Sequence, residues 1–250
     1  MIDYSNFDWG WMDHPLEVIQ DGEVSYVWHI GEDGTVMPMS QYHKESLIKE
    51  IFQSRIYEKY FMVEENDIVV DIGASIGPFT FSILNKKPKH VFCLEPSEKE
   101  ISTLVKNTLG HPVTVINKGI SDINSTVEND FLFGGESKME GITFSKFIKL
   151  YGLEKIDFIK IDCEGGEYDV FTLENLEYLK SNVRKITGEW HLSNEEEKNK
   201  FKNFRDTILV NFDNYEVNSI DGVDIKWDLF NDHFIEYYNQ IILYIDNSTV

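Results

Sequence analysis

The chain has 250 residues, enough for one large core domain with an extension, and its 23 basic against 44 acidic side chains give a formal net charge of −21. A charge of this sign and size repels phosphate backbones, so we expect no nucleic-acid partner. Hydrophobic residues make up 42% of the chain. No apolar run approaches the roughly 20 residues of a membrane span, so we expect no membrane partner either.

The first forty residues are rich in aromatic side chains and turn signals, which predicts short strands and loops. Their rings include Trp9, Trp11 and Trp28. We interpret the segment as a lid over an acceptor pocket or as a subunit contact in a homo-oligomer, with ordinary packing onto the core as the alternative. The opening residues, MIDY, lack the basic and apolar regions of a signal peptide, so we expect a cytoplasmic location.

Residues 43–61 place apolar side chains at helical spacing, which predicts an amphipathic helix. From residue 67 onward, apolar strand-like segments alternate with helical patterns, as in a parallel sheet covered on both faces. We expect an α/β fold with a doubly wound, mostly parallel sheet of seven strands, at 68–72, 90–95, 113–117, 157–162, 184–190, 210–220 and 241–245. Residues 122–141 lack a clear period, which predicts a loop or loose hairpin. The predicted domains are an N-terminal cap and helix, 1–62, and a core domain, 63–250.

The stretch DIVVDIGASIGPFTF, residues 67–81, ends an apolar strand in Asp71 and then turns through Gly73 and Gly77. Such a turn before a helix lets backbone N–H groups approach a ligand at the edge of the sheet. The pattern differs from the dinucleotide fingerprint, because Ser75 stands where a middle glycine would be. Asp71 would also repel a pyrophosphate. A ligand with cationic groups, such as S-adenosylmethionine, therefore suits this turn better than a nicotinamide cofactor.

Acidic residues also follow the next two strands of the predicted sheet. Glu95 ends the second strand before Pro96, and Asp122 follows Ser121 after the third. A carboxylate at such a strand end can accept hydrogen bonds from the hydroxyls of a ribose. Together with the glycine turn, these residues predict an adenosine site. The predicted cofactor-binding residues are Asp71, Gly73, Ala74, Ser75, Gly77, Glu95, Pro96, Ser121, Asp122 and Asp162.

An ordered set of segments carries a family resemblance: VVDIGASIGPFTFS (69–82), VFCLEPSEKEISTLVKN (91–107), GITFSKFIKLYG (141–152), IDFIKIDCEGGEYDVF (156–171) and GEWH (188–191). In this order they resemble the FkbM-like S-adenosylmethionine-dependent methyltransferases. The resemblance implies a class I, Rossmann-like methyltransferase fold and, for most members, methyl transfer to a hydroxyl oxygen. The chain departs from the family pattern at Ser75 and Ser145, where asparagine and aspartate are more usual.

Two strand ends carry the residues that predict catalysis. The period of two places Lys160, Asp162 and Glu164 on one face of one strand, and Glu189 and His191 on one face of the next. A histidine beside an acid can take a proton from a hydroxyl, so we interpret Asp162, Glu189 and His191 as catalytic, with His191 as the base. A structural role for His191 stays open. So does a divalent-cation site made by the same three residues, which we do not favour because no compact ligand motif supports it.

We expect an S-adenosylmethionine-dependent O-methyltransferase that acts on a hydroxyl of a small-molecule or saccharide acceptor and leaves S-adenosylhomocysteine. One alternative is a scaffold or interaction protein that keeps the methyltransferase fold without catalysis. A nicotinamide-dependent oxidoreductase is the less favoured alternative. Cys93 and Cys163 lie in apolar segments rather than in a spaced framework, which predicts neither a disulfide nor a zinc site.

Overall fold

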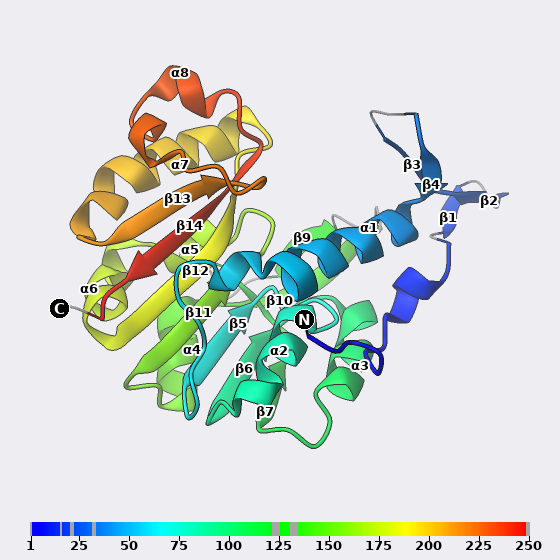
Figure 1. The fold of residues 1–250 in the computed structure, drawn as a ribbon, viewed down its shortest axis with the longest axis horizontal. Coiled ribbons are helices and arrows are strands. Elements are labelled where there is room, and N and C mark those ends of the chain that lie inside the picture. The colour runs from blue at the N-terminus through cyan, green and yellow to red at the C-terminus, as the bar shows by residue number, and fades with distance from the viewer. Residues whose placement is uncertain are drawn as a thin grey trace.

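The computed structural model describes residues 2–15, 17–20, 23–31, 34–121, 126–130 and 135–248. Its centre is a seven-stranded sheet in the order β13-β14-β12-β11-β5-β6-β7 (Figure 1). The strands are β5 (Ile68–Ile72), β6 (His90–Leu94), β7 (Val113–Ile116), β11 (Ile156–Ile161), β12 (Val183–His191), β13 (Tyr215–Ser219) and β14 (Gln240–Asp246). Five of them are parallel, and β14 pairs antiparallel with both β12 and β13. The predicted doubly wound, mostly parallel sheet is confirmed.

Helices cover both faces of this sheet (Figure 1). One face carries α4 (Phe144–Tyr151), α5 (Glu167–Val170), α6 (Leu173–Asn182) and α7 (Glu195–Thr207). The other face carries α2 (Pro78–Ile83), α3 (Glu98–Asn107) and the N-terminal segment. Each face has its own hydrophobic cluster, which includes Phe204 of α7 on the first face and Phe79 of α2 on the second.

The central strands send alternate residues to the two faces. In β11, Ile159 and Ile161 join the cluster under α4–α7, whereas Phe158 joins the cluster on the N-terminal side. Lys160, between the two isoleucines, faces that second side and lies over the ring of Tyr57. Polar residues thus replace apolar ones on this face as the strands approach their carboxyl ends.

The N-terminal segment contributes to the core and also extends away from it. Phe7, Trp9 and Met12 are buried in the same cluster as Phe52, while the hairpins β1–β2 and β3–β4 project from the body of the molecule (Figure 1). Trp28, on the second hairpin, is 54% exposed. The elements are η1 (Gly10–Asp13), β1 (Glu17–Gln20), β2 (Glu23–Tyr26), β3 (Trp28–Ile30) and β4 (Val36–Pro38).

The single helix predicted over 43–61 is three shorter elements: α1 (Met39–Leu47), η2 (Ile48–Ser54) and η3 (Ile56–Glu58). The middle one is a π-helix and the last a 3₁₀-helix. The helix cannot continue beyond Ser54, because Arg55 adopts a left-handed conformation with φ of 53°. Apolar spacing over the whole stretch is preserved, so periodicity alone does not reveal the break.

A smaller sheet, in the order β8-β10-β9, begins after β7 in the chain. β9 and β10 pair antiparallel, in agreement with the loose hairpin predicted for this region. Its strands are β8 (Gly119–Ile120), β9 (Thr126–Asp130) and β10 (Gly135–Ile142), and the remaining short helices are η4 (Leu84–Lys86), η5 (Leu209–Asn211), η6 (Lys226–Asp228) and α8 (Asp232–Ile235).

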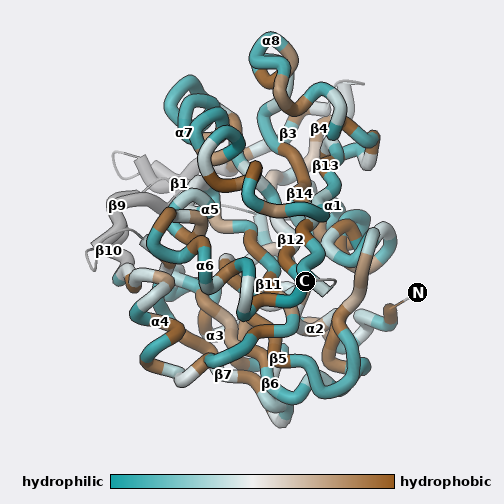
Figure 2. Tube along the Cα trace, turned by 90° about the vertical axis from the view of Figure 1, so that its left-hand side faces the viewer, coloured by the Kyte–Doolittle hydropathy of each residue, from teal (hydrophilic) through white to brown (hydrophobic). Residues whose placement is uncertain are grey.

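Hydrophobic residues gather in the strands at the middle of the molecule, whereas α7 carries mostly hydrophilic residues (Figure 2). This is the distribution of a core covered by amphipathic helices. Both cysteines are free, and Cys93 is buried. Within the described ranges, none of the helices combines the length and the apolar character needed to cross a membrane.

Candidate active site

The glycine turn after β5 is fixed by contact with the loop after β11. Gly73 and Gly77 have φ of +71° and +89°, values that L side chains rarely adopt. A Cβ at Gly73 would lie 1.7 Å from the carbonyl oxygen of Asp162. The N–H groups of Gly73 and Ala74 both donate to the carbonyl of Leu94. Only a glycine therefore lets the loops after β5 and β11 approach this closely.

Asp71 and Lys160 form a buried ion pair beneath this turn. The Lys160 ammonium lies 3.3 Å from Asp71 Oδ1 and donates a 2.7 Å hydrogen bond to the carbonyl of Gly73. Thr80 donates to Asp71 Oδ2 at 2.7 Å. Burial raises the pKa of Asp71, and the charge of Lys160 offsets part of that rise. Asp71 is fully buried, so it holds the turn in place through Lys160 rather than facing solvent.

Glu95, directly after β6, binds the backbone of the same turn. Its two oxygens accept hydrogen bonds from the N–H groups of Ser75, at 2.8 Å, and Ser97, at 2.7 Å. Ser75 in turn donates through its hydroxyl to Glu100. Burial and the charge of Glu100 raise the pKa of Glu95 to about 8. The carboxyl thus joins the two turns that follow β5 and β6.

The other predicted cofactor residues lie around the same edge. Pro96 packs near Gly119 of β8. Ser121 is buried, and its N–H donates to the carbonyl of Ile142. Asp122 lies outside the described residues.

Asp162, directly after β11, is the meeting point of three elements. Its Oδ2 accepts a 2.8 Å hydrogen bond from the hydroxyl of Tyr57 in η3 and lies 3.8 Å from the Lys160 ammonium. The same hydroxyl lies 3.4 Å from Oε2 of Glu189 in β12. Burial, together with the charges of Asp162 and Glu189, raises the pKa of Tyr57 well above its ordinary value, so the phenol stays a donor. Tyr57 is not among the site residues predicted from the sequence, because it lies in a helical pattern far from the strand ends.

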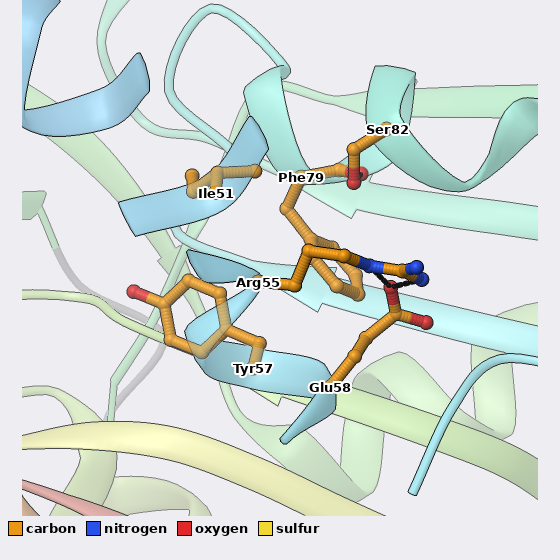
Figure 3. Close-up of a pocket in the computed structure, with 6 residues that line it drawn as sticks. All are labelled: Ile51, Arg55, Tyr57, Glu58, Phe79 and Ser82. Carbon is orange, nitrogen blue, oxygen red and sulfur yellow. Dashed lines mark hydrogen bonds and ion pairs between the residues drawn. The ribbon is translucent and has the colours of Figure 1, made fainter. Parts of the chain in front are cut away.

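The segment around Tyr57 is anchored by a second ion pair. Figure 3 shows a narrow cleft in which Arg55 and Glu58 pair, while the Tyr57 hydroxyl points away from them. Arg55 donates to Glu58 Oε2 at 2.5 Å, and Glu58 also pairs with Lys86 and accepts from the N–H of Val63 at 2.9 Å. Two cations and one backbone amide on one carboxylate hold η3 against the domain, which keeps the Tyr57 hydroxyl at Asp162.

His191, the last residue of β12, faces a group of carboxylates. Its Nδ1 donates to Oε1 of the fully buried Glu167 at 2.9 Å. Its Nε2 lies 3.4 Å from Glu164, 3.9 Å from Glu189 and 4.0 Å from Asp162. Burial opposes ionisation of the ring, but the hydrogen bond to Glu167 and the surrounding acids outweigh it and raise the pKa of His191 to about 10. The imidazole is therefore cationic at neutral pH.

Comparison with protein families places this site in a known domain. Residues 71–217 match the methyltransferase FkbM domain. This range is more than half of the chain and contains the carboxyl ends of β5, β6, β11 and β12. The chain belongs to the FkbM methyltransferase family. The resemblance read from the sequence is confirmed, and no curated protein sequence matches the chain.

One solved structure similar to this FkbM-family chain is that of a proposed rRNA-methylase from Clostridium thermocellum. The two sequences are 16% identical, the match covers 78% of this chain and 96% of that one, and the TM-score is 0.49. A fibrillarin pre-rRNA processing protein from Methanococcus jannaschii has 10% identity, coverage of 94% and 83%, and a TM-score of 0.47. A proposed methyltransferase from Streptococcus mutans, in complex with SAH, has 10% identity, coverage of 74% and 90%, and a TM-score of 0.46. At this level of similarity none of the three bears on what the FkbM-family chain acts upon.

The charge around the site fits the cofactor of a methyltransferase. Burial and the charges of neighbouring acids raise the pKa of both Glu95 and Glu189 to about 8, so a further negative charge is unfavourable at this edge and a positive charge would be stabilised there. S-adenosylmethionine carries a sulfonium and an ammonium, and a cationic ligand is stabilised where acids are close together and partly desolvated. Within the described ranges no group of His, Cys, Asp and Glu side chains has the arrangement of a metal site.

Proposed function

We propose that this methyltransferase transfers the methyl group of S-adenosylmethionine to a hydroxyl oxygen of a small-molecule or saccharide acceptor. The observation that carries the proposal is the convergence of Asp162, Glu189 and Tyr57 beside the glycine turn, where an acceptor hydroxyl would find both a hydrogen-bond acceptor and a donor. The formal charge of −21 supports an acceptor that is not a polyanion.

The cofactor supplies an electrophilic methyl group, and the protein positions the acceptor in line with it. We assign cofactor binding to the turn at Gly73–Gly77, to Glu95 and Pro96, and to the neighbourhood of Ser121. Asp71 does not contact the cofactor in this proposal, because it is fully buried. It supports the turn indirectly, through its ion pair with Lys160. Glu95 keeps one free lone pair on each oxygen beyond its bonds to Ser75 and Ser97, so ribose hydroxyls can add to it.

Removal of the acceptor's proton falls to Asp162 in this proposal. A general base has to be unprotonated before the reaction, and the pKa of about 10 at His191 leaves its ring charged. The side chain of Asp162 is 31% exposed, whereas that of His191 is only 7% exposed, so Asp162 has the better access to a ligand. His191 then acts by holding Glu164 and Glu189 in place. The role of His191 as the base, predicted from the sequence, stays a prediction. A comparison of turnover in Asp162→Asn and His191→Gln tests it.

Calorimetric titration tests the cofactor directly. Wild-type protein should bind S-adenosylmethionine and S-adenosylhomocysteine and should not bind NADH. Glu95→Gln should weaken the binding of S-adenosylmethionine roughly ten- to a hundred-fold. The amide NH₂ replaces one of the two oxygens that accept the N–H groups of Ser75 and Ser97, and a buried donor left without a partner costs about 1–3 kcal/mol. Glu98→Gln, an exposed glutamate three residues later, is the matched control. Binding of NADH, or an unchanged affinity in Glu95→Gln, contradicts the assignment.

Release of S-adenosylhomocysteine in the presence of a panel of hydroxylated compounds tests the reaction. A scaffold without catalysis would bind the cofactor and release no product with any of them. Transfer to nitrogen or carbon acceptors, with none to hydroxyls, would contradict the proposed O-methyl transfer while leaving the family activity intact.

A further inference from the structure

A groove of about 800 Å³ separates the N-terminal segment from the edge of the sheet formed by β13 and β14. Its walls come from the β3–β4 hairpin, α1 and η2 on one side and from β14 and the loop after β13 on the other. A cavity of this size is large enough for a ligand of several rings. All the residues that line it lie outside residues 71–217, the part of the chain that the family domain covers.

The groove and the catalytic cluster share one face of the sheet. In the antiparallel pairing of β12 with β14, His191 lies opposite Gln240 and Glu189 lies opposite Ile242. Directly paired residues project to the same side of a sheet, and both Gln240 and Ile242 line the groove. The groove therefore lies on the same face of the sheet as the carboxylates that surround Asp162, one strand away from them.

Glu50 lines the groove and also interacts electrostatically with Asp162 of the catalytic cluster. It lies in the π-helix η2, where the N–H of Arg55 donates to the Glu50 carbonyl five residues earlier; π-helical turns are frequent at functional sites. Its side chain lines the groove and has no hydrogen bond or ion pair with any residue that the structure describes. Burial, with the charge of Asp162, raises the pKa of Glu50 to about 7. A half-buried carboxyl without a partner, facing a cavity, is free to bind a ligand.

The groove wall indicates what kind of ligand fits. Tyr42 is stacked on His29, with ring centroids 3.6 Å apart and planes 14° apart, and both rings line the groove. The charged residues along the wall have both signs, since Lys49 and Lys59 stand among acids, so the wall selects no particular ligand charge. The other polar side chains of the wall carry hydroxyl or amide groups, and they include Ser46, Ser54, Ser219 and Gln240.

We propose that this groove binds the methyl acceptor, and that the acceptor is a neutral polyhydroxylated ring compound of the hexopyranoside class. The apolar C–H face of a pyranose packs on an aromatic ring such as Tyr42, and its hydroxyls donate to carboxylates such as Glu50. Glu50 acts as an acceptor-binding residue at the end of the groove nearest to Asp162. The inference rests on the proposed function and adds the place and class of the acceptor.

Saturation-transfer NMR with a fixed set of probes tests the groove. The probes are the methyl α-pyranosides of glucose, galactose, mannose and rhamnose, with glucose 6-phosphate and catechol for comparison, each measured with S-adenosylhomocysteine present. We expect at least one methyl pyranoside to bind, and Tyr42→Ala and Glu50→Gln each to weaken it about tenfold, the effect of one good contact. Tyr237→Ala and Glu65→Gln, exposed residues outside the groove, should leave it unchanged.

Ser46→Trp provides a second approach, because it fills the groove without removing a contact to the core. It should abolish pyranoside binding and leave the affinity for S-adenosylhomocysteine, measured by calorimetry on the same samples, as in wild type. Pyranoside binding that survives Tyr42→Ala, Glu50→Gln and Ser46→Trp, or tighter binding of glucose 6-phosphate or catechol than of every pyranoside, overturns the inference. If the wild-type protein binds the cofactor but none of the pyranosides, the inference about the groove is wrong and the proposed function stands. If the wild-type protein does not bind the cofactor, both the inference and the proposed function are wrong.

Discussion

The hydroxyl of Tyr57 donates a 2.8 Å hydrogen bond to Asp162 across 105 positions of the chain. Tyr57 lies before the residues that match the family domain, and Asp162 lies inside them. The contact therefore joins the N-terminal segment to the carboxyl end of β11, and it brings a donor to the carboxylate that we assign as the proton acceptor.

Tyr57→Phe should lower turnover about tenfold while leaving the affinity for S-adenosylmethionine nearly unchanged. The variant keeps the ring that packs edge-on against Phe79 and removes only a hydrogen bond to a charged group, worth about 1.5–3 kcal/mol. Steady-state kinetics and calorimetry measure the two effects. Tyr60→Phe, a half-exposed tyrosine nearby, is the control. Wild-type turnover in Tyr57→Phe would remove Tyr57 from the site.

Asp162→Asn should lower turnover by about 10²–10⁴-fold, the usual contribution of a positioned acid–base group. His191→Gln should have a smaller effect, because the ring is already protonated at neutral pH, with a pKa of about 10. Single-turnover rates with saturating cofactor separate this step from binding. The reverse ranking would return the base role to His191. Rates restored only by added magnesium or manganese would indicate a metal held by these residues.

The free energy of unfolding should fall as the pH rises from about 5 to 8. Burial, with the charge of Asp162, raises the pKa of Glu189 to about 8. Over this range the unfolded chain has released a proton that the folded protein still holds, so raising the pH favours the unfolded state. Glu189→Gln should reduce this slope by up to about 1 kcal/mol per pH unit. Urea unfolding at several pH values measures it.

The control for that slope is Glu174→Gln, which removes an exposed carboxylate from α6 and leaves the buried cluster intact. Equal changes in slope for Glu174→Gln and Glu189→Gln would mean that the trend comes from the overall negative charge of the protein. An unaltered slope in Glu189→Gln would show that Glu189 titrates normally.

Gly73→Ala should destabilise the protein and abolish cofactor binding, because the added Cβ would lie 1.7 Å from the carbonyl oxygen of Asp162. Gly152→Ala is a matched control: its φ of +62° is close to the +71° of Gly73, but nothing lies within 4 Å of the added carbon. The difference between the two in thermal unfolding isolates the clash from the backbone strain. Similar stabilities, with cofactor binding retained, would contradict the close approach of the two loops.

The fold could be predicted because its strands are continuous apolar runs, which report burial on both faces. The period of two also grouped Lys160 with Asp162, and Glu189 with His191, within their own strands. It could not show that Asp71 would be fully buried, since that depends on Lys160 lying across the neighbouring strand. Tyr57 and Glu50 were missed because their positions depend on the π-helix and on the left-handed Arg55, and neither changes the apolar spacing. The domain division at residue 62 stays a prediction.

Trp190 and His191 are neighbours in the chain, yet they point to opposite faces of β12. Trp190 is fully buried and stacks on Phe204, whereas His191 faces the carboxylates. Substitutions on one face of this strand can therefore accumulate without disturbing the other face. Because one face packs in the core and the other faces the site, selection can act on stability and on substrate preference separately. A lineage could exchange one acceptor for another while the packing that keeps the strand in place goes unchanged.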